Sequence, residues 1–205
     1  MEATDVLKTL RELRDVSFAT VDAHGCPRIR TIDVMLVEGT SLYFCTARGK
    51  DVHAEIMAMP CVAIGALTSG FVSISLHGTA RRLPDEEQPA WIDRIFAENP
   101  GMVEVYPGDA RYILEAFVIE SGTIDLFDLS RPAVSRASLA FGSATVPPAG
   151  FTITDACIGC GTCVDACPQK CVEAGVPFTI IQEHCLRCGR CAEHCPAGAI
   201  ERMHA

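Results

Sequence analysis

The sequence lacks an excess of basic residues, a long apolar run and a leader-like start. Seventeen Lys and Arg stand against 26 Asp and Glu, a formal net charge of −9 with no basic stripe, so we expect no nucleic-acid partner. No stretch approaches the roughly 18 uninterrupted apolar residues of a membrane helix, so we expect no membrane partner. The first residues, MEATDVLKTLRELRDV, carry frequent charges and no apolar core. We therefore expect no signal peptide and a cytoplasmic protein.

A nicotinamide fingerprint is also missing, because no Gly-x-Gly-x-x-Gly opens a helix after a strand. An apolar share of 49% with 21% charged residues excludes a disordered or collagen-like chain. The 205 residues allow one or two domains. The cysteines are unevenly placed, since nine of the twelve lie between Cys157 and Cys195. This placement predicts two parts of the chain with different chemistry.

The C-terminal cysteines form two identical runs of the pattern C-x2-C-x2-C-x3-C-P. The eight cysteines are Cys157, Cys160, Cys163 and Cys167, then Cys185, Cys188, Cys191 and Cys195. In a reducing compartment, dense cysteines are metal ligands more often than disulfides. A zinc site uses four ligands, typically as two C-x2-C pairs. The spacing therefore favours iron–sulfur clusters over zinc or disulfides.

These runs resemble those of bacterial two-cluster ferredoxins, in which the fourth cysteine of each run binds the other cluster. The resemblance implies two [4Fe–4S] clusters. Cluster one would be held by Cys157, Cys160, Cys163 and Cys195, and cluster two by Cys185, Cys188, Cys191 and Cys167. Gly159, Gly161 and Gly189 would let each loop bend around its cluster.

The two runs belong to an internal repeat that begins at Phe151 and again at Phe178. Each copy offers a short strand, a cluster loop and a short helix, so we expect a pseudo-two-fold pair. The repeat places Cys171, the ninth cysteine, opposite Ala199. We favour a small buried residue in an alanine position over a spare ligand or redox thiol.

The first 128 residues read as an α+β domain. Apolar residues at helical spacing predict an N-terminal helix around residues 6–13. Turn residues separate strand-like runs. We expect strands at 17–21, 28–37, 41–45, 61–67, 71–83, 112–120 and 123–128, and helices near 51–59 and 85–97. Many short strands with few helices predict a barrel with helices at its ends. Residues 129–150, rich in small residues with three prolines, are predicted as a linker without a core element.

The order of these parts resembles the pyridoxamine 5′-phosphate oxidase-like split β-barrel proteins. The hairpin ATVD-x-x-G-x-P, the turn from Thr46 to Lys50 and the strand HGTARRL carry this resemblance over about residues 5–128. Met59 departs from the family, which usually has Asn before the helix-ending proline. The resemblance implies FMN bound at the interface of a homodimer. The predicted domains are 1–128 (FMN-binding split barrel), 129–150 (linker) and 151–205 (two-cluster ferredoxin).

The candidate flavin site lies at this turn. Thr46, Arg48 and Lys50 precede a helix N-terminus, and a flavin phosphate needs cations and free N–H groups there. Arg28 and Arg30 share one face of their strand. The family pattern implies that Arg30, Thr31, Ile32 and Asp33 lie along the flavin ring. The alternative for all these charges is a solvated surface. No catalytic residue is identified, and we expect His77 to be a hydrogen-bonded bystander.

Together, these features predict an oxidoreductase that passes electrons between a small substrate at FMN and an external carrier through two clusters. One alternative is a non-catalytic electron-transfer or redox-sensing protein, with the barrel as a dimerising or docking module. Another is a barrel that binds deazaflavin or haem. Residues 151–205 carry six acidic and four basic side chains, so a redox partner protein should present a basic patch. A small-molecule electron donor or acceptor is the other expected partner.

Overall fold

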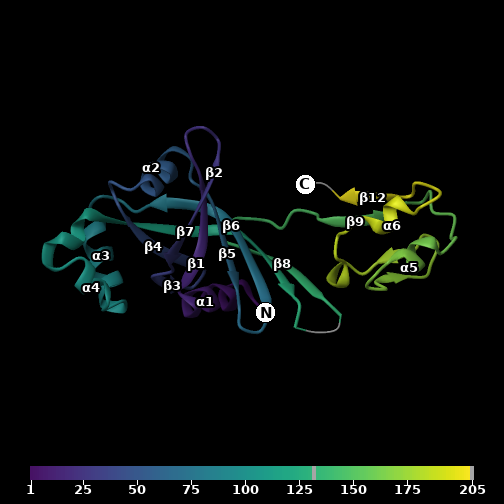
Figure 1. Ribbon diagram of the computed structural model, residues 1–205, viewed down its shortest axis with the longest axis horizontal. Helices are drawn as coiled ribbons and strands as arrows, with labels where there is room; N and C mark the ends of the chain where they lie inside the picture. The colour runs from purple at the N-terminus through teal and green to yellow at the C-terminus, as the bar shows by residue number, and fades with distance from the viewer. Residues whose placement is uncertain (131–132, 204–205) are drawn as a thin grey trace. The chain divides into compact units, whose positions relative to one another are not determined.

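The computed structural model describes residues 1–130 and 133–203 and has the predicted α+β architecture. The chain divides into two compact units (Figure 1). Unit 1 comprises residues 1–68, 74–124 and 139–145, and unit 2 comprises residues 69–73, 125–138 and 146–205. Residues 131 and 132 of the predicted linker and 204 and 205 of the predicted ferredoxin domain lie outside the described residues.

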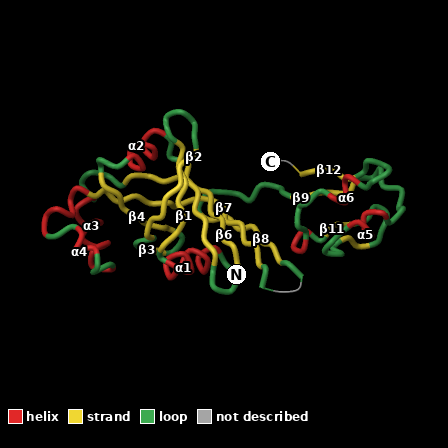
Figure 2. The backbone as a smooth tube through the Cα atoms, viewed as in Figure 1, coloured by secondary structure: helices red, strands yellow, loops and turns green. Residues whose placement is uncertain are grey.

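An eight-stranded, curled sheet, most of which belongs to unit 1, forms the centre of that unit (Figure 2). Its strands are β1 (Asp15–Val21), β2 (Pro27–Asp33), β3 (Leu36–Glu38), β4 (Ser41–Ala47), β5 (Cys61–Leu67), β6 (Val72–Arg82), β7 (Leu114–Asp128) and β8 (Ser135–Phe141). Their order is β2-β1-β5-β6-β7-β4-β3, and β8 pairs with β7. Strand β1 lies between β2 and β5 and pairs antiparallel with both.

Alternating apolar residues build the core of this sheet. Phe18, Phe44 and Phe117 are fully buried, and the Phe44 ring lies 5.0 Å from Phe18 and 5.4 Å from Phe117. Each such ring contributes about 1.5–3 kcal/mol by leaving water. The helices of this unit are α1 (Ala3–Leu13), α2 (Asp51–Ala58), α3 (Gln88–Glu98), α4 (Met102–Val105) and the 3₁₀ helix η1 (Gly108–Ile113). Helix α1 buries one apolar face, as its spacing predicts.

Two predicted strand boundaries are wrong. The strand expected at 28–37 is divided into β2 and β3, because the Val34 and Met35 N–H groups bond instead to the Arg14 and Tyr43 carbonyls. The strands expected at 112–120 and 123–128 form one long β7. Gly122 allows this continuity, since a Cβ there would lie 2.3 Å from the His77 carbonyl oxygen of β6.

The predicted linker contains a strand with a buried end, so the expectation of no core element there is wrong. Strand β8 pairs with β7, and Phe141 at its end is buried. The weak Ser/Ala alternation of this segment does not predict a strand, because its conformation is set by pairing with β7. Residues 125–138, the far ends of β7 and β8, belong to unit 2.

Unit 2 holds the repeat. It contains β9 (Gly150–Ile153), α5 (Thr162–Ala166), β10 (Val172–Glu173), β11 (Thr179–Ile180), the 3₁₀ helix η2 (Gln182–His184), α6 (Arg190–Glu193) and β12 (Ile200–Met203). Strand β9 pairs with β12 and β10 with β11. Equivalent hydrogen bonds join the halves, from the Thr154 N–H to the Ala199 carbonyl (2.9 Å) and from the Ile181 N–H to the Cys171 carbonyl (2.8 Å). The repeat alignment of Cys171 with Ala199 therefore holds in space.

Among residues 1–130 and 133–203, no helix is both long and apolar enough to cross a bilayer.

Candidate cofactor sites

One cavity of unit 2 is lined by Cys157, Cys160, Cys163 and Cys195. These are the four cysteines predicted for cluster one, and three come from the first run and one from the second. Apolar side chains complete its wall, including those of Ile153, Phe178 and Ile200. The structure thus brings together the crossed set, and its role as a ligand set stays a prediction.

The thiols of this cavity differ in their surroundings. The Thr162 hydroxyl lies 3.4 Å from the Cys160 sulfur, and this hydrogen bond lowers the pKa of the exposed Cys160 thiol. Burial raises the pKa of Cys163. A thiolate is the form that binds metal, so the buried thiol needs a metal centre to offset the cost of losing its proton.

Three of the four cysteines predicted for cluster two lie in an apolar core. Cys167, Cys185 and Cys191 are buried there with Val172 and Ile180, whereas Cys188 is exposed. The Arg187 N–H donates to the Cys185 sulfur at 3.3 Å, and the Ala199 N–H donates to the Cys195 sulfur at the same distance. Such N–H···S bonds stabilise thiolates, so the second run is built to hold ligand sulfur in its anionic form at both of its ends.

Cys171 sits inside the cluster-two core. It is 3% exposed, against 1% for Ala199 in the equivalent position, and its sulfur lies 3.5 Å from that of Cys167. Burial and the Cys167 sulfur raise the pKa of Cys171 to about 12. A neutral thiol at that position is a packing group beside a ligand, in agreement with the favoured interpretation.

We expect Cys171→Ala to leave the iron content and visible absorption unchanged, because the other half of the repeat already uses alanine in this position. The measurement is iron and sulfide analysis of anaerobically purified protein. Cys167→Ala is the matched comparison and should reduce the iron content. A loss of iron in Cys171→Ala would instead make Cys171 a ligand.

A cavity of about 710 Å³ opens on unit 1 at the candidate flavin site. Six of the eight residues predicted to bind the flavin line it: Arg30, Thr31, Ile32, Asp33, Thr46 and Lys50. Apolar side chains, among them Met35 and Leu114, line the rest. Ligand cavities of this kind commonly measure about 300–1,000 Å³ and combine apolar walls with a few polar groups. The donor set and the volume fit a flavin nucleotide.

The cations near this cavity are not equivalent. Arg30 lines it but is ion-paired to Glu55 of α2 at 2.7 Å and donates a hydrogen bond to Thr20. Lys50 immediately precedes α2 at its N-terminus. Among the cavity's cations in the described part of the chain, Lys50 alone has no ion pair. It is therefore the cation available to an incoming phosphate.

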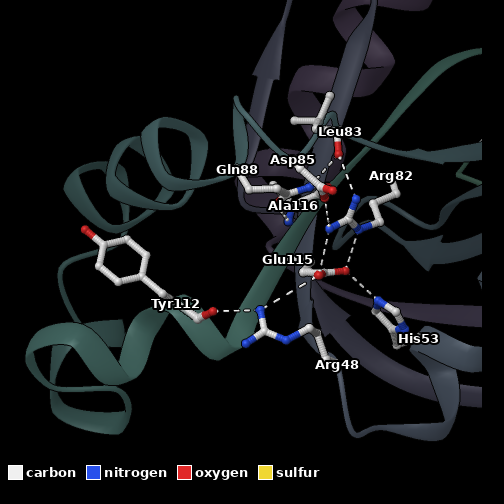
Figure 3. A network of polar contacts seen from close by, with 9 residues as sticks. All are labelled: Arg48, His53, Arg82, Leu83, Asp85, Gln88, Tyr112, Glu115 and Ala116. Atoms are coloured by element: carbon white, nitrogen blue, oxygen red, sulfur yellow. Dashed lines mark hydrogen bonds and ion pairs between the residues drawn. The ribbon is translucent and has the colours of Figure 1, made fainter.

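The other two predicted arginines do not line the cavity. Arg28 is exposed and paired to Asp22 at 2.9 Å, as the surface-charge alternative states. Arg48 donates to the Tyr112 carbonyl at 2.8 Å and lies 3.8 Å from Glu115 (Figure 3). Both remain untested as ligand-binding residues.

Sequence analysis missed Glu115, which is 5% exposed and anchors the network of Figure 3. Arg82 of β6 donates to its two oxygens at 2.6 and 2.8 Å, and the His53 ring nitrogen lies 2.6 Å away. The Arg82 bonds lower the pKa of Glu115 to about 2 against the opposing effect of burial, and His53 adds to the lowering. The Arg82 in HGTARRL was the available signal, but its partner lies 33 residues away.

Comparison with known proteins places the barrel in a family. Residues 4–120 match the family described as pyridoxamine 5′-phosphate oxidase. The chain belongs to the pyridoxamine 5′-phosphate oxidase family. Residues 156–199 match the 4Fe–4S dicluster domain, so the predicted barrel–ferredoxin combination is confirmed. The chain therefore joins an oxidase-family barrel to an iron–sulfur domain, as expected of a redox protein.

A curated relative of this chain is the dihydrophenazinedicarboxylate synthase of Pseudomonas chlororaphis. It is 33% identical over 94 residues, a match that spans 44% of this chain and 42% of the relative.

Solved structures share the fold at low identity. A NimC/NimA family protein from Clostridium acetobutylicum has a TM-score of 0.57 and 15% identity, covering 68% of this chain and 92% of its own. An FMN-binding relative from Nostoc punctiforme has a TM-score of 0.51 and 17% identity, covering 68% and 93%. A haem-binding protein from Mycobacterium smegmatis has a TM-score of 0.51 and 15% identity, covering 67% and 57%. These likenesses confirm the split-barrel fold class.

Proposed function

We propose that this protein is an FMN- and iron–sulfur-dependent oxidoreductase that acts as a homodimer in the cytoplasm. It would exchange electrons with a small substrate at the barrel and pass them through two [4Fe–4S] clusters to or from an external carrier. The observation that carries the proposal is the presence, in one chain, of an oxidase-family cavity with a free cation and a dicluster domain.

The residues of the cavity divide the work of binding. The Lys50 ammonium, the Thr46 hydroxyl and the N–H groups at the start of α2 would hold the phosphate. Met35 and Leu114 offer apolar contact for the ring. Asp33 also lines the cavity; burial and the neighbouring Asp15 carboxyl raise its pKa, against the opposing effect of Arg14, which pairs with it at 3.4 Å.

A flavin supplies chemistry that exchanges two electrons with a substrate and one at a time with a carrier, and each cluster carries one electron. The curated relative is named as a synthase, which favours a catalytic barrel over a purely dimerising one. The haem-binding neighbour supports the second candidate, a barrel that holds a different cofactor.

We expect Lys50→Ala to weaken FMN binding by about tenfold to a hundredfold, since a hydrogen bond to a charged group contributes about 1.5–3 kcal/mol. FMN titration of anaerobically purified protein, followed by flavin fluorescence, measures this. Arg81→Ala is the matched control and should bind FMN normally, because Arg81 forms an exposed ion pair with Glu120 and does not line the cavity. Unchanged affinity in Lys50→Ala would exclude the assigned phosphate site.

Electron transfer is tested in the same proteins. Illumination of bound FMN with a sacrificial amine donor under argon should produce the electron paramagnetic resonance signal of reduced clusters in the wild type. At an FMN concentration that saturates only the wild type, Lys50→Ala should give a much weaker signal of reduced clusters. Flavin reduction without any cluster signal would contradict the proposed path. Uptake of haem or deazaflavin in preference to FMN would support the second candidate.

A further inference from the structure

The two cluster loops differ at one equivalent position. Gly159 stands two residues after Cys157, and Arg187 stands two residues after Cys185. Both have a positive φ, of 69° and 57°. A non-glycine residue in this conformation costs about 1–3 kcal/mol, and such strain concentrates at functional sites. The second loop therefore accepts strain to hold an arginine beside the predicted ligand Cys185.

A second arginine reaches the same place from β8. Val134 lies just before this strand, and its N–H donates to the Gln169 side chain at 3.4 Å. The Val134 carbonyl oxygen lies 2.9 Å from the Nδ1 atom of His184. Gln169 and His184 neighbour Cys167 and Cys185 in sequence, so the β7–β8 hairpin is fixed beside two predicted ligands of cluster two. Within this hairpin, the Arg136 guanidinium lies 4.4 Å from the centre of the Phe127 ring.

The two arginines are both partly buried and lie near enough for the charge of one to act on the other. Burial and the charge of Arg187 lower the pKa of Arg136, whereas Asp125 and Cys185 act in the opposite direction. The Nε atoms of both arginines are buried, and neither has a hydrogen-bond partner among residues 1–130 and 133–203. Two like charges in such a place are costly unless negative charge lies nearby. A thiolate-bound cluster at Cys185 would supply that charge.

We propose that Arg136 and Arg187 raise the reduction potential of cluster two above that of cluster one. Reduction adds one electron, from [4Fe–4S]²⁺ to [4Fe–4S]⁺, and so adds negative charge to a site that already carries thiolates. Nearby cations stabilise the reduced state, and net charge is one of the determinants of cluster potential. An electron that enters unit 2 would then reduce cluster two in preference to cluster one. Both arginines act through the cluster and are positioning residues.

The test is a potentiometric titration of the cluster-loaded full-length protein, followed by electron paramagnetic resonance. Arg136→Gln and Arg187→Gly should each shift the equilibrium of one and the same reduction step at least tenfold toward the oxidised form, which is 59 mV for one electron. Cys188→Ser identifies that step as cluster two by changing its signal. Arg136→Lys keeps the charge and should leave the step unchanged. Arg81→Gln is the charge control, because Arg81 forms an exposed ion pair with Glu120 in unit 1.

Equal shifts of both steps, no shift, or a shift of the step that Cys188→Ser leaves alone would overturn the proposal. Arg187→Gly introduces the residue that the other loop already has, so it keeps the test available if Arg136→Gln loses its clusters. The inference rests on the proposed second cluster. The presence of that cluster and the effect of the arginines on its potential can be disproved separately. Iron and sulfide content of the wild type tests the cluster, and the potentials of the variants test the arginines.

Discussion

Cys195→Ser should remove the same cluster as Cys157→Ser, although the two residues belong to different runs. The cavity that contains both sulfurs gives the reason, because a cubane that loses one of four ligands is held by the remaining three alone. We expect about half of the iron to be lost in each variant, since the two clusters contain equal iron. Iron analysis and the number of reduction steps measure the loss.

Double variants make this test sharper. Cys157→Ser with Cys195→Ser should lose no more iron than either single variant, whereas Cys167→Ser with Cys195→Ser should lose both clusters. Cys26→Ser, an exposed thiol of unit 1, is the control and should keep its iron. The reverse pattern, with Cys167 and Cys195 behaving as one unit, would show that each run holds its own cluster.

Glu115→Gln should lower the free energy of unfolding of the barrel by about 3–5 kcal/mol, the usual cost of removing one partner from a buried ion pair. The reason is that Arg82 and His53 would keep their positions around a neutral amide. Chemical denaturation followed by the fluorescence of Trp91, the single tryptophan, measures it. Glu120→Gln breaks the exposed Arg81 pair and should cost less than about 1 kcal/mol.

The stability contributed by the Glu115–Arg82 ion pair should depend on pH. The pKa of Glu115 in the folded protein, about 2, lies below the ordinary value of 4.5 for a glutamate. Its contribution to stability is therefore complete above pH 4.5 and declines as the pH falls toward 2. The stability difference between wild type and Glu115→Gln should be smaller at pH 3 than at pH 5. A difference that stays constant down to pH 3 would mean that Glu115 has an ordinary pKa.

The cysteine runs could be interpreted from sequence because ligand chemistry dictates their spacing locally. The same holds for Lys50, which is placed by a turn only five residues long. Arg48 could not be placed in this way, because its partners, Tyr112 and Glu115, are more than sixty residues away along the chain. Side-chain direction in such cases is decided by tertiary partners and not by local pattern.

Strand β8 shows the same limit for secondary structure. Its own residues have weak strand preference, and pairing with β7 decides its conformation. The long β7 depends similarly on Gly122 and the close approach of β6. By contrast, α1 was predictable because its apolar spacing is contained in eleven consecutive residues.

The β7–β8 hairpin also determines how the protein can be cut. A fragment of residues 151–205 would retain all eight predicted cluster ligands and would look self-sufficient in sequence. It would nevertheless leave behind Val134, which bonds to Gln169 and His184, and Arg136 with its charge. Such a fragment and the whole chain would be different electron carriers, so recombination of these modules in engineered fusions has to transfer residues 125–138 with the ferredoxin part.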